Sequence, residues 1–77
     1  MLRAYILIQT EIGTGAGVAS AIAGVGGVTS VSAVSGPYDL IAEAEAASVD
    51  EMGCVVMDRI QTVDGITRTL TCPVVRM

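Results

Sequence analysis

The chain has 77 residues, a formal net charge of −4 and four basic side chains, all of them arginine. Nucleic-acid-binding modules neutralise phosphates with a basic patch, so this composition argues against direct binding of DNA or RNA. The absence of histidine from the sequence removes the commonest general base and the commonest metal ligand. We expect no metal and no other cofactor.

The length allows a single domain, residues 1–77. A domain of this size buries roughly 60% of its unfolded surface and is marginally stable by itself. We therefore expect the chain to gain stability by forming an oligomer. The N-terminus does not resemble a secretory signal, and we expect Cys54 and Cys72 to be small buried hydrophobic residues rather than a disulfide. No apolar run approaches the ~20 residues of a membrane span, which predicts a soluble, cytoplasmic protein.

The first half of the chain predicts a strand and a helix. Residues 2–10 are rich in Ile, Leu and Tyr and carry apolar side chains on both faces, as expected for a central strand. The glycines that follow do not fit the G-x-G-x-x-G fingerprint in either frame, and the chain has no lysine for a phosphate-binding P-loop. We therefore expect a glycine loop and then a helix over about 15–25, with Val18, Ile22 and Val25 facing a sheet.

The middle of the chain predicts a β-hairpin. Residues 28–35 form its first strand, in which Val28, Ser30, Ser32 and Val34 are expected on one face and the residues between them, including Val31, on the other. Residues 36–39, Gly-Pro-Tyr-Asp, form the turn. In the second strand, residues 40–46, small apolar side chains alternate with Ile41, Glu43 and Glu45. One face of this strand can lie beneath helices, and the other presents two carboxylates on the opposite side of the sheet.

A second helix and a final strand are predicted after the hairpin. Residues 48–51, Ser-Val-Asp-Glu, form a capping box, which opens a helix running to about Gln61. The expected core positions of this helix are Met52, Val55, Val56, Ile60 and Val63. A second side, formed by Gly53, Cys54 and Met57, either packs against another subunit or exposes scattered apolar residues.

The closing segment, from Ile66 to Val75, alternates Ile66, Arg68, Leu70, Cys72 and Val74 with the residues between them. Pro73 cannot donate a ladder hydrogen bond, so this strand should lie at a sheet edge. The order of elements predicts an α+β, ferredoxin-like βαββαβ fold, with both helices on one face of a four-stranded antiparallel sheet. The free face is expected to pair with a second copy, giving a dimeric α/β barrel.

Several stretches resemble the effector-binding (RAM) domain of the Lrp/AsnC, or feast/famine, transcription regulators. They are A-Y-I-L-I-Q-T in the first strand, V-G-G-V before the second, V-S-A-V-S-G-P-Y-D-L-I-A-E-A-E-A, and D-R-I-Q-T-V-D-G-I-T-R-T-L-T. The G-x-Y-D turn is the most specific of these. Full-length members carry an N-terminal helix-turn-helix that this sequence lacks, so the resemblance implies a stand-alone form with no direct DNA binding.

The resemblance also implies that a small amino acid binds between subunits of a homodimer, in an assembly of dimers that can reach octamers. The site residues that it implies are Gly36, Tyr38, Asp39, Met52, Thr71 and Cys72. Backbone N–H groups of the glycine turn can hold a carboxylate, and Asp39 can accept from an α-ammonium group. The alternatives are that Asp39 only braces the turn and that Tyr38 only packs between subunits.

Three functions remain open at this level. The first is an amino-acid-responsive oligomeric module that acts through partners, such as full-length regulators of the same fold. The second is a purely structural oligomerisation module. The third is a small dimeric α/β-barrel enzyme in which Glu43 and Glu45 act as acid and base. The lack of His, Lys and Trp argues against an enzyme.

Overall fold

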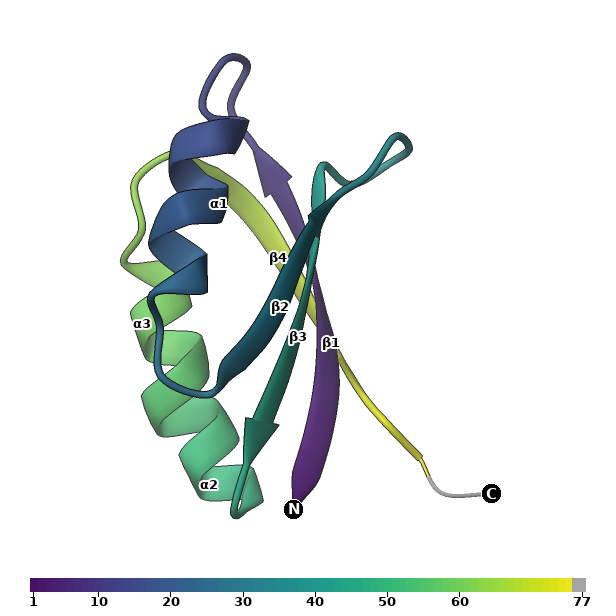
Figure 1. The fold of residues 1–77 in the computed structure, drawn as a ribbon, viewed down its shortest axis with the longest axis vertical. Coiled ribbons are helices and arrows are strands. Elements are labelled where there is room, and N and C mark those ends of the chain that lie inside the picture. Colours follow the sequence, from purple (N-terminus) through teal and green to yellow (C-terminus); the bar gives the residue numbers. More distant parts are fainter. Residues whose placement is uncertain (76–77) are drawn as a thin grey trace.

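The computed structural model describes residues 1–75, apart from the side chain of Val55, so the core role predicted for that side chain lies outside the described residues. A four-stranded antiparallel sheet is covered on one face by two helical segments, and its other face is open (Figure 1). The strands are β1 (Leu2–Thr10), β2 (Val28–Ala33), β3 (Leu40–Ala46) and β4 (Ile66–Pro73). The helices are α1 (Gly15–Ala23) and a second segment made of α2 (Val49–Glu51), η1 (Met52–Met57) and α3 (Asp58–Gln61).

The sheet order β2-β3-β1-β4 confirms the ferredoxin-like βαββαβ fold. β1 is central and pairs with β3 from Leu2↔Ala46 to Ile8↔Leu40. β4 lies at an edge, as Pro73 predicted, and pairs with the other side of β1. None of the helices formed by the described residues is long and apolar enough to cross a membrane.

The core lies between the sheet and the helices. Alternate residues of β1 and β3 face it, and the alanines of β3 let the helices approach closely. The buried side chains are Ala4, Ile6, Ile8, Val18, Ile22, Leu40, Ala42, Ala44, Ala46, Met52, Val56 and Ile60. Each of the larger ones stabilises the fold by about 1.5–3 kcal/mol relative to exposure. The predicted inward faces of α1 and β3 are thus confirmed.

Two irregularities in the sheet make the predicted alternation of β2 and β4 wrong. A register shift between Val28 and Ser30 turns both Val28 and Val31 toward the core, although they were expected on opposite faces. A second shift, opposite Gln9 and Thr10, turns Ile66 to the core side, away from the face of Arg68. An extra residue in a strand reverses the facing of everything beyond it.

The capping box predicted at the start of the second helix is present. Ser48 Oγ accepts from the Glu51 backbone N–H at 3.1 Å, and Glu51 Oε2 accepts from the Ala47 N–H at 3.0 Å. In a standard capping box the glutamate accepts from the N–H of the cap residue, here Ser48. Glu51 accepts instead from Ala47, the residue before it. The helix begins where predicted and ends at Gln61, but its middle, η1, is a π-helix rather than an α-helix.

Gly65 fixes the turn before β4 against the start of α1. Its φ of +98° suits glycine, and an added Cβ would lie 2.9 Å from Thr14 Oγ1 and 3.0 Å from Val18 Cγ2. We expect Gly65→Ala to destabilise the fold by about 1–3 kcal/mol from backbone strain, with the contacts adding to it. Chemical denaturation measures this. Gly17→Ala is the control: Gly17 lies in α1 with open space around it, so alanine there should leave stability equal or slightly raised. Equal effects of the two variants would contradict this account.

Candidate functional site

The β2–β3 turn is attached to the end of β1 through Asp39. Asp39 Oδ2 accepts from the Thr10 backbone N–H at 2.8 Å and from the Thr10 hydroxyl at 3.2 Å. The Asp39 N–H donates to the Ile8 carbonyl at 2.9 Å, and its carbonyl accepts from the Val34 N–H at 3.0 Å. Asp39 therefore braces the turn. No hydrogen bond among the described residues reaches its second carboxylate oxygen, Oδ1, which remains available to a ligand.

The other two predicted residues of the turn are accessible. Gly36 is exposed with a φ of +155°, and no atom lies within 4 Å of the position that a Cβ would take. Tyr38 is half-buried. Gln9 supports the turn through its side-chain amide, which donates to the Pro37 carbonyl at 3.4 Å. The tip is thus held by β1 while its backbone remains open to an approaching group.

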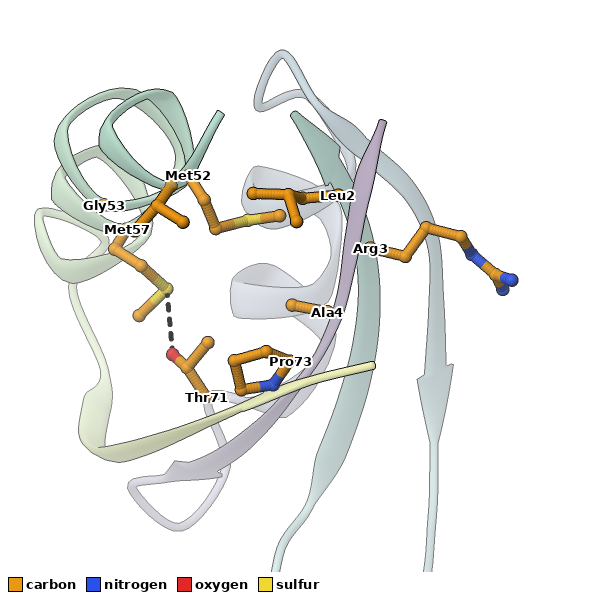
Figure 2. Close-up of a pocket in the computed structure, with 9 residues that line it drawn as sticks. Leu2, Arg3, Ala4, Met52, Gly53, Met57, Thr71 and Pro73 are labelled. Carbon is orange, nitrogen blue, oxygen red and sulfur yellow. Dashed lines mark hydrogen bonds between the residues drawn. The ribbon is translucent and has the colours of Figure 1, made fainter. Parts of the chain in front are cut away.

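Met52 and Thr71, also predicted as site residues, line a cavity at the opposite end of the sheet (Figure 2). The cavity has a volume of about 260 Å³ and lies between the start of β1, the end of β4 and the second helical segment. The Thr71 hydroxyl donates to the Met57 sulfur at 3.2 Å. The lining of the cavity consists of Leu2, Arg3, Ala4, Val49, Met52, Gly53, Met57, Thr71 and Pro73.

The π-helix explains why Met52 and Met57 share this cavity. Five residues apart on an α-helix, they would point about 140° away from each other, and sequence periodicity accordingly separates them. A π-helix closes i→i+5 hydrogen bonds, which brings residues five apart onto one side. Met52 is buried and Met57 packs against the core, so the predicted separation of Met57 from the core side is wrong. The sequence carries no signal that we recognise for this segment.

The predicted burial of both cysteines is wrong. Cys54 and Cys72 are free and exposed. Cys72 pairs with Tyr5, and directly paired residues share one face of a sheet. This face is the open one, because the neighbours of Tyr5 on either side, Ala4 and Ile6, are buried beneath the helices. Cys72 therefore lies on the side of the sheet away from the cavity that Thr71 lines.

The six predicted site residues do not meet within one chain. The turn adjoins the Ile8↔Leu40 pair, whereas the cavity reaches from Leu2 to Thr71, the partner of Ile6. Between about 7 and 20 Å of strand therefore separates the turn from the residues that line the cavity. Figure 1 shows this separation, with the hairpin tip at the end of the sheet opposite to α2 and the N-terminus. Gly36, Tyr38 and Asp39 form one group, Met52 and Thr71 another, and Cys72 stands apart.

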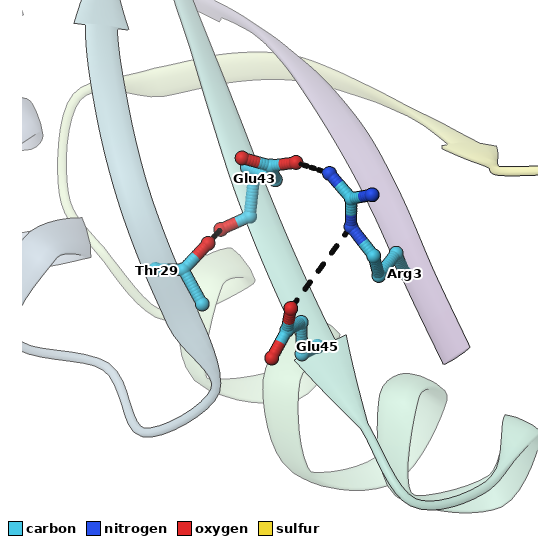
Figure 3. A network of polar contacts seen from close by, with 4 residues as sticks. All are labelled: Arg3, Thr29, Glu43 and Glu45. Carbon is cyan, nitrogen blue, oxygen red and sulfur yellow. Dashed lines mark hydrogen bonds and ion pairs between the residues drawn. The ribbon is translucent and has the colours of Figure 1, made fainter. Parts of the chain in front are cut away.

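The open face of the sheet has a charged network at one end (Figure 3). The Arg3 guanidinium donates a hydrogen bond to Glu43, and Arg3 Nε lies 3.9 Å from Glu45 Oε1. The contact with Glu43 raises the pKa of Arg3 above its ordinary value. Both carboxylates thus have a cationic partner, which disfavours their use as an acid and base pair.

The middle of the open face carries an apolar cluster, while polar residues surround it: Gln9 pairs with Arg68, and Ser30 and Ser32 lie on β2. Leu7 pairs directly with Leu70 and with Ile41 on the neighbouring strand. Tyr5 is 42% exposed and Leu70 is 45% exposed. Exposed apolar clusters of this kind are frequent at interaction sites.

Comparisons with known proteins bear on the family and the fold of this chain. The sequence model of the Lrp/AsnC ligand binding domain matches residues 3–77. The chain belongs to this family. A relative of this Lrp/AsnC domain is the uncharacterised HTH-type transcriptional regulator PH1916 of Pyrococcus horikoshii, 34% identical over 71 residues. Those residues cover 88% of this chain and 47% of the relative, so the chain spans about half the length of the curated relatives it matches.

Solved structures share the Lrp/AsnC domain fold over nearly the whole chain. TTHA0845 from Thermus thermophilus superposes with a TM-score of 0.92 at 34% identity, covering 100% of this chain and 96% of that one. The Neisseria meningitidis transcriptional regulator NMB0573, solved as a complex with L-Met, has a TM-score of 0.85 at 18% identity. The match covers 97% of this chain and 50% of that protein, and at this identity it bears on the fold alone.

Proposed function

We propose that this Lrp/AsnC domain is an oligomeric, amino-acid-responsive module that acts through partner regulators of the same fold. Its match to the ligand-binding domain over residues 3–77 carries the proposal. The structural neighbour NMB0573 was solved with L-Met, and by analogy with that complex we propose a free amino acid as the effector class. The module would bind its effector, change its assembly and thereby influence transcription regulators.

The effector site is proposed to form between subunits. The hairpin tip of one subunit, with Gly36, Tyr38 and Asp39, supplies polar groups for the α-carboxylate and α-ammonium. The cavity end of a neighbour, with Met52 and Thr71, receives the remainder of the ligand. The separation of the two regions within one chain supports a shared site, since neither region alone offers both kinds of contact. Cys72 lies on the open face of the sheet, so it would adjoin this site without contacting the effector.

The dimer is proposed to form by packing two open faces together, and further assembly of dimers would join hairpin tips to cavities. The apolar pairs around Leu7 and Leu70 support the first contact. Neither DNA binding nor catalysis is proposed for these 77 residues. The net charge of −4 with no lysine opposes the former, and the pairing of Glu43 and Glu45 with Arg3 opposes the latter.

A thermal-shift screen of the twenty amino acids tests the function. A ligand that binds only the folded state at ten times its Kd stabilises by about 1.4 kcal/mol. For a domain of this size that raises Tm by about 5–10 °C. We expect such a shift for at least one amino acid. No shift with any amino acid at millimolar concentration would reject the proposal.

That negative result would favour the second candidate, a structural oligomerisation module. The contacts of Asp39 with Thr10 are the observation in its favour, because they explain this aspartate without a ligand. Light scattering separates the outcomes further, since a strictly monomeric chain would contradict both candidates.

A further inference from the structure

We propose that the cavity beside the π-helix receives the effector's side chain and therefore selects amino acids with aliphatic or thioether side chains. This inference rests on the proposed function and adds the chemical class of the ligand. It excludes effectors whose side chains are charged or carry an amide. The lining of the cavity, its origin in the helix and its size each support this selectivity.

The lining offers almost nothing to a polar side chain. Leu2, Ala4 and Met52 contribute carbon and sulfur (Figure 2). The one hydroxyl in the lining, that of Thr71, already donates to Met57. Arg3 contributes only the base of its side chain, because its guanidinium extends to the other face of the sheet (Figure 2) and pairs with Glu43. A charged or amide group entering here would lose water without gaining a partner.

The π-helix makes the cavity both open and adaptable. It brings Met52 and Met57 to one side, and Gly53 between them adds no side chain to the mouth. Methionine side chains are flexible and polarisable, so they can adjust to ligands of somewhat different shape. π-helical turns are frequent at functional sites, and this one has an evident consequence for the shape of the cavity.

The size of the cavity suits an amino-acid side chain. A dry apolar cavity of about 150 Å³ is enough to bind benzene. The volume here is about 260 Å³, which accommodates the side chain of leucine, isoleucine or methionine. Val49, which lines the cavity, is 74% exposed. The cavity therefore meets solvent there, and the α-ammonium and α-carboxylate can stay at this mouth. There they can reach water or the hairpin tip of a neighbouring subunit.

Calorimetric titration of the intact protein with matched amino acids tests the selectivity. We expect L-leucine or L-methionine to bind at least about tenfold more tightly than L-asparagine and L-aspartate, which is within the range that pocket complementarity delivers. Tighter binding of asparagine or aspartate would overturn this inference and leave the proposed function intact. Failure of all amino acids to bind would reject the proposed function together with it.

A variant that fills the cavity tests the location. Gly53→Leu adds a side chain where no atom lies within 4 Å of the Cβ position, and we expect it to fold and to weaken leucine or methionine binding at least about tenfold. Gly17→Leu is the matched control, because Gly17 also has open space but lies in α1 away from the cavity. It should bind like the parent. Unchanged binding in Gly53→Leu would overturn the assignment of the cavity to the effector. If the oligomeric mass changed while binding did not, the cavity would instead be a contact site for a second copy of the chain.

Methyl NMR provides a measurement that needs no variant. With methionine methyls labelled in the parent protein, addition of L-leucine should shift the resonances of Met52 and Met57 and leave that of Met1 in place. Spectra in which binding saturates while neither cavity methionine moves would also overturn the proposal.

Discussion

Leu70→Glu is expected to dissociate the proposed dimer into monomers with a lower Tm. Leu70 lies on the open face opposite Leu7 and is 45% exposed in the isolated chain, so the single subunit tolerates a polar residue there. In a symmetric face-to-face dimer the same substitution occurs on both partners. It would place two unpaired carboxylates in a desolvated interface, at a cost of several kcal/mol per ion.

Light scattering coupled to size exclusion measures this outcome directly. Ile12→Glu is the matched control, because Ile12 is fully exposed in the β1–α1 turn and also changes from a large apolar residue to glutamate. The control should keep the parental mass and Tm. A dimer of unchanged mass and concentration dependence in Leu70→Glu would show that the open face is not the dimer interface.

Asp39→Asn is expected to abolish the response to amino acids while leaving most of the stability. The asparagine keeps one side-chain oxygen to accept from Thr10, but it loses the negative charge that would attract an α-ammonium group. Asp39→Ala should lose the response as well. It should also lose about 2 kcal/mol of stability, since both hydrogen bonds from Thr10 to the carboxylate disappear.

Thermal shift with and without the effector separates the two roles of Asp39. Thr10→Val is the control, because it removes the hydroxyl contact and retains the backbone N–H that donates at 2.8 Å. It should lower Tm modestly and preserve the response. A full response in Asp39→Asn would mean that the aspartate only braces the turn.

The regular parts of the fold could be predicted because the sequence alternates without interruption there. In β3, and in β1 from Ala4 to Ile8, every second residue is buried. In α1 the buried pair Val18 and Ile22 follows helical spacing. Strand order followed from the sequence of elements and the handedness of crossovers. No long-range information was needed for these conclusions.

The errors occur where one residue too many enters a regular element. The shift near Thr29 and the shift before Arg68 each reverse a face, and the widened turn in η1 moves Met57 beside Met52. Such features depend on tertiary packing rather than on local propensity. The burial of the cysteines was predicted from the general tendency of Cys to be buried. Cys72 is exposed because its position in β4, opposite Tyr5, places its side chain on the open face.

The candidate site was predictable only in pieces. The turn residues and Met52 with Thr71 were named from the family resemblance, and the structure gives each group a coherent setting. That the groups lie apart along the sheet could not be seen without the strand register. The apolar character of the cavity could not be predicted either. It depends on the π-helix and on the Arg3 guanidinium pairing with Glu43 on the open face of the sheet.

Mixing two inactive variants tests the shared site most directly. Asp39→Asn has an intact cavity and Gly53→Leu has an intact hairpin tip, so each alone should fail to bind the effector. If a site combines the tip of one subunit with the cavity of another, co-refolding equal amounts should restore about one quarter of the parental sites by random assembly of a symmetric oligomer. Calorimetric stoichiometry measures that fraction. Recovery near one quarter is the result that we predict, and no recovery in oligomers shown to contain both variants would contradict a site built from two subunits.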